Sequence, residues 1–190
     1  QCAGGMETEV DTYRRLITEV YPKGIVSIVS DTWDLWKVLT ELTVTLKEEI
    51  LGREGKVVFR PDSGDPVKII LGDPEAPEGS PARNGAVRCL WGVYGGTIND
   101  EGFRTLNQHV GLIYGDSITL DRAWQILDGL KKMGYSSDNI VFGVGSYTYQ
   151  YVTRDTYGTA MKATHAIING VPKMLFKDPK TDNGLKKSAK

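Results

Sequence analysis

Four apolar stretches of the sequence each end in a short cluster of polar residues or glycines. The clusters are Ser30-Asp31, Arg60-Pro61-Asp62-Ser63-Gly64, Gly115-Asp116-Ser117 and Gly143-Val144-Gly145-Ser146. Arginine and carboxylate side chains form charge-assisted hydrogen bonds with phosphates and hydroxyl groups, and glycines at a helix start let backbone N–H groups approach an anion. Mg²⁺ prefers one or two carboxylates together with phosphate oxygens. The combination therefore favours chemistry on a phosphorylated sugar.

Taken singly, each of these residues also has a purely structural interpretation. Asp31 precedes an expected helix, so it either caps that helix or acts in a site. Arg60 ends an apolar strand, where its charge needs an anion or a carboxylate, and Asp62 is its nearest candidate partner. Gly115-Asp116 fits the entry to a helix as well as a loop that binds a ribose diol. Both interpretations stay open at this point.

Two cations and two histidines complete the set of candidates. Arg154 and Lys162 follow the last glycine-rich cluster and are possible phosphate ligands, although isolated surface cations are more often solvated. His109 lies in a polar helix end and His165 in an apolar run. We expect a structural role for both histidines and no metal site built from them.

Alternating β-branched runs and helical stretches predict the elements that position the clusters. Expected strands cover residues 24–30, 56–60, 110–114 and 139–143, with two further strands over 161–169 and 173–176. Apolar residues recur every three or four positions over 32–51, which predicts a helix there. The spacing is typical of βαβ units, so we expect an α/β fold, either part of an (α/β) barrel or an open doubly wound sheet. In both folds the carboxyl ends of the strands share one face, where ligands bind.

The remaining connections are also predictable. We expect helical pieces from Pro66 and over 86–94, with a surface insertion at 72–85 that is rich in Pro, Gly and charged residues. Residues 119–133 form the clearest helix, which Gly134 is placed to end. The apolar stripe expected on this helix consists of Leu120, Ala123, Trp124, Leu127 and Leu130.

Composition excludes several classes of protein. The 190 residues suit one domain, and neither the 40% hydrophobic nor the 25% charged content is unusual. No apolar run approaches the roughly 18 residues of a membrane span, and a net charge of −1 gives no footprint for nucleic acid. Only Cys2 and Cys89 are present, which argues against a disulfide framework and predicts a cytoplasmic location. Because Gln1 is not an initiator Met and 177–190 is polar, we expect a piece of a longer protein.

Five stretches of the sequence carry a family resemblance. They are IVSIVSDTWDLWKVL, VVFRPDSGDPVKII, GLIYGDSITLDRAWQIL, NIVFGVGSYTYQYVTRDTYG and the closing FKDPKTD with KKSAK. In order and spacing they resemble the C-terminal part of the catalytic region of the nicotinate and nicotinamide phosphoribosyltransferase family, and specifically its nicotinamide-using members. The resemblance covers residues 1–190, with the insertion at 72–85 as its least family-like part.

The resemblance implies a fold, an activity and partners. Members of the family form homodimers of an irregular (α/β) barrel of the quinolinate-phosphoribosyltransferase-like type, with active sites at the dimer interface. They transfer phosphoribose from phosphoribosyl pyrophosphate, as its Mg²⁺ complex, to nicotinamide, which gives nicotinamide mononucleotide (NMN) and pyrophosphate in NAD salvage. Coupling to ATP is a further implication of the resemblance.

The resemblance also implies roles for individual residues. Arg60 and Ser27 would line the nicotinamide pocket, while Asp62 and Asp116 would bind the ribose hydroxyls. Asp31 resembles the carboxylate that orients the family's catalytic histidine. The phosphoribosyl group would pack against Gly115, Gly143 and Gly145, and its phosphate would be bound across the interface by Arg154 and Lys162.

Two departures from the family pattern leave alternatives open. The catalytic histidine of the family lies just upstream of a segment like QCAGG, so the piece is not expected to act alone, and the residues that distinguish amide from carboxylate also lie upstream. Gly158 and Ala160 replace polar residues expected around the phosphate. The alternatives are a nicotinate phosphoribosyltransferase and, in another class, a non-catalytic α/β domain that binds a phosphorylated ligand.

Overall fold

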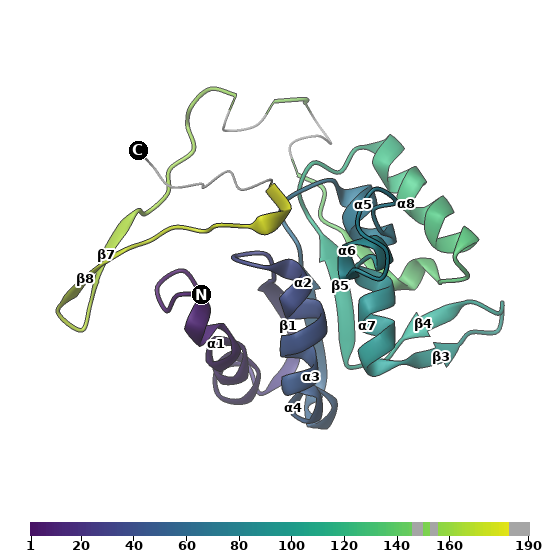
Figure 1. Cartoon of the computed structure of the whole chain (residues 1–190), viewed down its shortest axis with the longest axis horizontal. Helices are drawn as coiled ribbons and strands as arrows, with labels where there is room; N and C mark the ends of the chain where they lie inside the picture. Colours follow the sequence, from purple (N-terminus) through teal and green to yellow (C-terminus); the bar gives the residue numbers. More distant parts are fainter. Residues whose placement is uncertain (146–149, 153–155, 183–190) are drawn as a thin grey trace.

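A central parallel sheet organises the protein. The computed structural model describes residues 1–145, 150–152 and 156–182. The sheet has the order β1-β2-β5-β6, and all of its neighbouring strands are parallel (Figure 1). Its strands are β1 (Lys23–Val29), β2 (Glu54–Arg60), β5 (Val110–Tyr114) and β6 (Ile140–Phe142). The structure thus confirms the α/β class and the four expected sheet strands.

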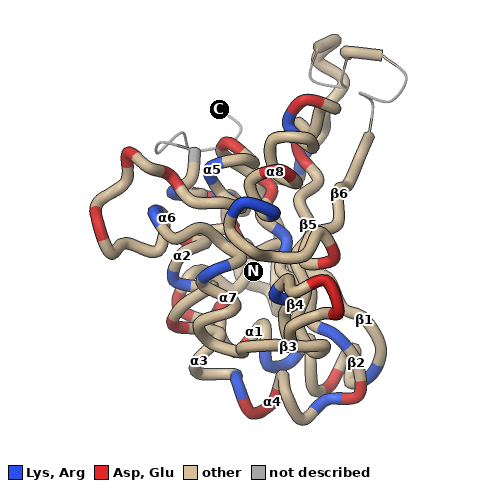
Figure 2. Tube along the Cα trace, turned by 90° about the vertical axis from the view of Figure 1, so that its right-hand side faces the viewer, with Lys and Arg blue, Asp and Glu red and all other residues tan. Residues whose placement is uncertain are grey.

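Helices cover only one face of this sheet in the described residues. Alternate strand side chains are buried beneath the helices, namely Val26, Ile28, Val57, Phe59, Val110, Leu112, Tyr114 and Ile140. The opposite face is open, with Ile25 exposed to 74% and Val141 to 58%. Figure 2 shows this one-sided arrangement, with the helices on one side and the strands on the other. An open doubly wound sheet carries helices on both faces, and the described residues lack that second layer.

The connection from β1 to β2 is a helical segment. It contains α2 (Leu35–Lys37), a π-helical turn (Val38–Leu42), α3 (Thr43–Thr45) and α4 (Lys47–Gly52). The predicted helix over 32–51 therefore exists, but it begins at Leu35. Its buried stripe has the expected spacing of three or four residues and includes Leu35, Leu39, Leu42, Leu46 and Ile50.

The longer connection from β2 to β5 contains three helices. They are α5 (Pro66–Leu71), α6 (Pro81–Asn84) and α7 (Ala86–Tyr94). Helices α5 and α7 are the expected helical pieces, whereas α6 lies within the stretch 72–85, which was expected to be a surface insertion without a helix. Between α5 and α6 the chain makes turns on the surface, and Lys68 holds them by ion pairs with Asp73 and Glu75. A hairpin of β3 (Gly96–Ile98) and β4 (Arg104–Leu106) follows α7 and was not expected, because its strands are only three residues long.

Helix α8 (Leu120–Lys132) joins β5 to β6, with Thr119 as its N-cap. The expected stripe is wrong in part, because Leu120 is 76% and Trp124 66% exposed. Ile126 and Leu130 are the buried residues, while Ala123 and Leu127 pack against the core. Positions 123, 126, 127 and 130 form the i, i+3, i+4, i+7 pattern of a helix that buries a single face.

The two ends of the described chain lie against this body. A short 3₁₀ turn (Met6–Thr8) leads into α1 (Glu9–Arg15) and a π-helical turn (Leu16–Val20) before β1. After β6 the chain forms an exposed hairpin of β7 (His165–Ile168) and β8 (Val171–Met174). Residues 176–182 then return to the carboxyl edge of the sheet and end in a 3₁₀ turn (Lys180–Asp182) (Figure 1). None of the described helices is long and apolar enough to cross a membrane.

Candidate active site at the carboxyl edge of the sheet

The four polar clusters follow neighbouring strands at one edge of the sheet. The register pairs Val29 with Arg60 and Tyr114 with Phe142, so the strands end beside one another. Because all four strands are parallel, the residues after them lie on the same side of the molecule. For the described residues, the structure thereby confirms that the clusters share one edge, while Ser146 of the last cluster lies outside the described residues.

Asp31 is fully buried at this edge. Its Oδ2 accepts hydrogen bonds from the backbone N–H of Asp62, at 2.9 Å, and from the hydroxyl of Ser63. Its Oδ1 is buried and has no hydrogen-bond partner among the described residues. The N-cap interpretation of Asp31 is wrong, because the Oδ1 of Asp34 accepts from the backbone N–H groups of Trp36 and Lys37.

Arg60 and Asp62 form an ion pair at the next strand end. Their Nη2 and Oδ1 atoms are 3.6 Å apart, and the side chains are 42% and 34% exposed. The Nε of Arg60 is buried without a hydrogen-bond partner among the described residues. A Cβ atom at Gly115 would lie 3.1 Å from Nη2 of Arg60, so a glycine leaves room for the guanidinium there. Both charged groups therefore keep hydrogen-bonding capacity for a ligand at this edge.

Glycines bring the ends of β5 and β6 close together. A Cβ atom at Gly143 would lie 2.8 Å from the Cα of Gly115, a separation that real Cβ atoms do not show. Asp116 follows Gly115 with an exposed side chain, and its Oδ2 accepts from the hydroxyl of Ser117 at 3.1 Å. A Cβ atom at Gly145 would meet no atom of the described residues within 4 Å. The glycines at 115, 143 and 145 thus leave the backbone at the ends of β5 and β6 without side chains at these positions.

The other predicted site residues, Ser27, Lys162 and Arg154, do not belong to the strand-end clusters. Ser27 is exposed on the open face of the sheet. In the register of β1 with β2 its partner is Val58, and this pair lies two residues before the pair of Val29 and Arg60 at the strand ends. Lys162 is exposed in the segment that leads to β7, and none of its described contacts joins it to the strand-end clusters. Arg154 lies outside the described residues. His109 makes a structural contact, since its Nδ1 is 3.1 Å from the carbonyl oxygen of Gly55 at the opposite end of the sheet.

Three residues of the edge were missed by the sequence reasoning. Tyr114 is buried, and its hydroxyl donates to the carbonyl oxygens of Ser63 and Gly64. The hydroxyl of Thr181 is hydrogen-bonded to that of Ser63, and Lys180 pairs with Asp34 at 2.6 Å. Of the residues in these hydrogen bonds to Tyr114 and Thr181, the motif RPDSG had marked only Ser63 as part of a polar cluster after a strand. Thr181 lies 118 residues further along the chain, in the closing stretch FKDPKTD, and nothing in that stretch points to a contact with Ser63.

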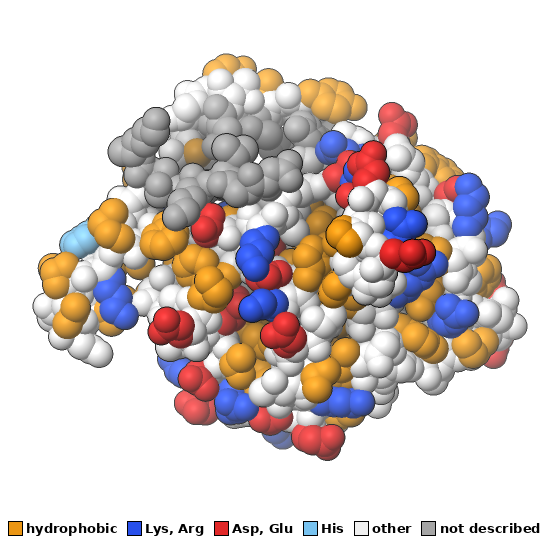
Figure 3. Space-filling model, in the orientation of Figure 1, with side chains coloured by type: hydrophobic (Ala, Val, Ile, Leu, Met, Phe, Trp, Pro, Cys, Tyr) orange, Lys and Arg blue, Asp and Glu red, His pale blue; other side chains and the backbone are white. Residues whose placement is uncertain are grey.

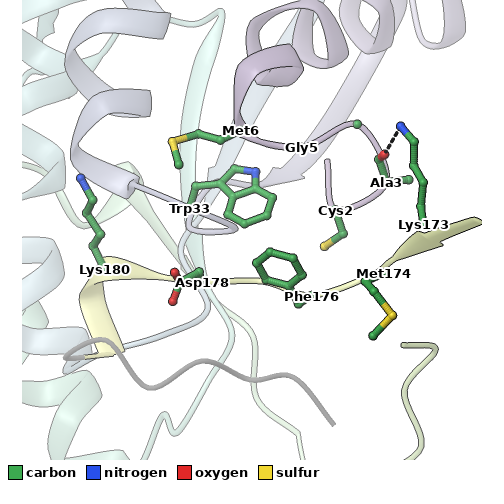
Figure 4. A pocket seen from close by; sticks show the side chains of 11 residues that line it. Cys2, Ala3, Gly5, Met6, Trp33, Lys173, Met174, Phe176, Asp178 and Lys180 are labelled. Atoms are coloured by element: carbon green, nitrogen blue, oxygen red, sulfur yellow. Dashed lines mark hydrogen bonds between the residues drawn. The ribbon is translucent and has the colours of Figure 1, made fainter. Parts of the chain in front are cut away.

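A cavity of about 610 Å³ adjoins the edge on the side of Trp33 (Figure 4). The rings of Trp33 and Phe176 meet edge to face in its wall, with centroids 5.5 Å apart. Lys173 closes one side, where its Nζ donates to the carbonyl oxygen of Ala3 at 3.2 Å. No described residue of the predicted site lines this cavity. Figure 3 shows acidic and basic side chains interspersed over the same face of the molecule.

A parallel sheet whose carboxyl edge gathers an arginine, three carboxylates and closely packed glycines defines an α/β protein with a candidate ligand site at its strand ends. The model of the nicotinate phosphoribosyltransferase (NAPRTase) family matches residues 3–190. The chain therefore belongs to this family.

Three relatives illustrate the similarity. The nicotinamide phosphoribosyltransferase of Acinetobacter baylyi is 60% identical over 194 residues, which cover 99% of this chain and 38% of the relative. The protein of the same name from Mycoplasma pneumoniae is 42% identical over 171 residues, with 86% and 36% covered. That of Xanthomonas campestris pv. campestris is 36% identical over 182 residues, with 95% and 36% covered. The chain thus spans less than two fifths of the length of these relatives.

Proposed function

We propose that the chain is part of an enzyme that transfers phosphoribose from phosphoribosyl pyrophosphate to nicotinamide, with NMN and pyrophosphate as products. The observation that carries the proposal is the contact of Arg60, Asp62 and Gly115 at the shared strand edge, beside the close approach of Gly143. These residues belong to the motifs on which the resemblance rests. The names of the similar proteins agree with the proposal.

In this proposal, different candidate residues bind different parts of the two substrates. Arg60 and Ser27 bind the nicotinamide, and Asp62 and Asp116 accept hydrogen bonds from the ribose hydroxyls. The glycines at 115, 143 and 145 let the backbone approach the phosphoribosyl group. Arg154 and Lys162 bind its phosphate from the partner subunit of a homodimer, which accounts for the distance of Lys162 from the other residues.

The chemistry calls for charge stabilisation more than for a strong nucleophile. Cleavage of the bond between ribose and pyrophosphate passes through a centre that resembles an oxocarbenium ion. Carboxylates fixed beside the ribose stabilise that positive charge, because preorganised dipoles and charges need no rearrangement during the reaction. The Oδ1 of Asp31 has no hydrogen-bond partner among the described residues, which supports its proposed part as the acceptor that orients a histidine from upstream of Gln1.

The residues present fit Mg²⁺ that arrives with the substrate. Asp62 and Asp116 offer hard carboxylate oxygens after the neighbouring strands β2 and β5, and Mg²⁺ needs only one or two of them when phosphates supply other ligands. Bound Mg²⁺ would neutralise charge on the leaving pyrophosphate. Coupling to ATP remains part of the proposal only through the family resemblance.

The proposed assembly extends beyond the 190 residues. We infer that the sheet is part of a barrel of the quinolinate-phosphoribosyltransferase-like type, because a barrel accounts for helices on one face and an open opposite face. The chain would form the C-terminal portion of that catalytic domain within a longer cytoplasmic enzyme. The greater length of the relatives supports this.

The experiment is a direct assay of the full-length protein with phosphoribosyl pyrophosphate and Mg²⁺, with and without ATP. We expect NMN from nicotinamide, and much less product from nicotinate. A preference for nicotinate would assign the nicotinate enzyme, which the name of the family also permits. Binding of phosphoribosyl pyrophosphate without any product from either base would assign the non-catalytic domain instead.

A further inference from the structure

We propose that Thr181 is a positioning residue that fixes the carboxylate of Asp31 through the hydroxyl of Ser63. The inference rests on the proposed function, because it assigns a purpose to the geometry of Asp31 in the phosphoribosyl transfer. It concerns a residue that lies outside the strand-end motifs. The connection joins parts of the chain that are 150 residues apart in the sequence, from Asp31 to Thr181.

The hydrogen bonds between the three side chains run in one direction. Asp31 is an acceptor when ionised, so the single hydroxyl proton of Ser63 is donated to its Oδ2. The oxygen of Ser63 then has only lone pairs to offer to Thr181, whose hydroxyl must be the donor. Thr181 thus donates to Ser63, and Ser63 donates to Asp31. Because Ser63 and Asp31 are both buried, water does not compete for these bonds.

The segment that carries Thr181, which we call the strap (residues 176–182), is held in place by its own contacts. The backbone N–H of Asp178 donates to the carbonyl oxygen of Thr32, and that of Lys180 to the carbonyl oxygen of Trp33, both at 2.9 Å. The Nζ of Lys180 adds the 2.6 Å ion pair with Asp34. The strap is therefore fixed to the residues that directly follow Asp31 in the sequence.

The strap packs closely against the turn that follows β2, at Gly64. A Cβ atom at Gly64 would lie 3.1 Å from the carbonyl oxygen of Thr181, and Gly64 has a φ of +82°. Tyr114 holds the same turn through its bonds to Ser63 and Gly64. Ser63 therefore belongs to a turn that Tyr114 holds in place, and this turn lies against the fixed strap.

The consequence is a defined orientation of the Asp31 carboxylate. Its Oδ2 is bound by the backbone N–H of Asp62 and by Ser63, which leaves Oδ1 as the oxygen available to a further donor. If the hydroxyl of Thr181 is lost, the oxygen of Ser63 loses the donor that holds it in place, so the hydrogen bond from Ser63 to Oδ2 is less well fixed. Small displacements of a group at a reacting centre have large effects on rate.

Two substitutions of Thr181 separate a hydrogen-bonding role from a packing role. Thr181→Val keeps the branched shape and removes the hydroxyl, whereas Thr181→Ser keeps the hydroxyl and removes the methyl group. In the full-length enzyme we expect Thr181→Val to lower kcat about five- to tenfold, with KM for both substrates changed less than about twofold. Thr181→Ser should keep kcat within about twofold of wild type. Thr45→Val, at an exposed hydroxyl on α3, is the matched control.

The reverse order, with Thr181→Ser impaired and Thr181→Val like wild type, would show that packing is the role of Thr181 and would overturn the proposal. Equal activity of both variants and wild type would overturn it as well. A wild-type protein without phosphoribosyl transfer would instead remove the proposed function.

If the wild-type protein lacks phosphoribosyl transfer, a measurement of stability still tests the hydrogen bonds that connect Thr181, Ser63 and Asp31. We expect Ser63→Ala and Thr181→Val to be coupled in a double-mutant cycle, by about threefold or more in the unfolding equilibrium constant. Additive effects of the two substitutions would show that the hydroxyl groups do not interact and would overturn the proposal independently of activity.

Discussion

The hydroxyl of Tyr114 donates to the carbonyl oxygen of Ser63 at 2.7 Å and to that of Gly64 at 3.0 Å. Tyr114 is the last residue of β5, and Ser63 lies in the turn after β2, so this bond joins two of the strand ends that form the candidate site. Burial, and then the negative charge of Asp116, raises the pKa of Tyr114 above its usual value. The hydroxyl therefore keeps its proton and remains a donor.

Tyr114→Phe removes this donor without changing the shape of the ring. We expect the free energy of unfolding to fall by about 1 to 3 kcal/mol, because the acceptors in the turn lose their partner. Denaturant titration measures the loss, with Tyr21→Phe at an exposed tyrosine as the control. Stability equal to wild type would mean that solvent replaces the tyrosine at this turn.

Asp62 and Asp116 are expected to stabilise the transition state of phosphoribosyl transfer. Asp62→Asn and Asp116→Asn should each lower kcat/KM of the full-length enzyme. The expected loss of transition-state stabilisation is about 2 to 4 kcal/mol, which is the scale of one preorganised polar contact. Asp100→Asn, in the hairpin between β3 and β4, is the control. Activity within about threefold of wild type for either variant would remove that carboxylate from the site.

Arg60 is expected to act on the nicotinamide ring. Arg60→Lys keeps the charge but loses the planar guanidinium, so we expect KM for nicotinamide to rise about tenfold or more, equivalent to about 1.4 kcal/mol. The measurement is steady-state kinetics with each substrate varied in turn, with Arg15→Lys at the exposed end of α1 as control. A structure with bound nicotinamide in which Arg60 contacts only Asp62, more than about 6 Å from the ring, would contradict this role.

Lys162 is expected to contact the phosphate of phosphoribosyl pyrophosphate. Lys162→Gln should raise KM for this substrate about tenfold and leave KM for nicotinamide nearly unchanged, because the lost interaction is with the phosphate alone. We expect the same selectivity for Arg154→Gln. Lys131→Gln, exposed on α8, is the control. Equal changes for both substrates would indicate a structural role.

Glu9 makes stability depend on pH in a direction that follows from its burial. Desolvation raises the pKa of Glu9 from 4.5 to about 7, and the nearby charge of Asp34 adds to the increase. The folded protein therefore keeps a proton that the unfolded chain releases above pH 4.5, so the free energy of unfolding falls as the pH rises from 4.5 to about 7. We expect the loss attributable to Glu9 to reach about 3 kcal/mol at most.

Glu9→Gln should remove this loss, so the variant should be more stable than wild type at pH 8 and similar to it at pH 4. Thermal unfolding across the pH range measures the effect. Glu7→Gln, at an exposed glutamate in the same segment, is the control. If the free energy of unfolding depends on pH in the same way in wild type and in Glu9→Gln, then ionisation of Glu9 does not destabilise the folded state.

The sequence determined the order of the elements and the places where polar residues follow the strands. A run of β-branched and other apolar residues is a local property, and such runs predicted β5 with its exact bounds and the other sheet strands to within two residues. The α/β class followed from the same spacing. Parallel strands then placed Arg60, Asp62 and Gly115 at one edge, since the carboxyl ends of such strands lie together.

The contacts that these residues make depend on how the chain packs in three dimensions. The periodicity of α8 allowed more than one apolar face, and packing against the core selected the face with Ile126 and Leu130 and left Trp124 exposed. The conformation of the loop decided that Asp34 caps α2 and that Asp31 is free to accept from Ser63. The bond from Thr181 to Ser63 joins residues distant in sequence, and a local pattern contains no information on which distant side chains the fold brings into contact.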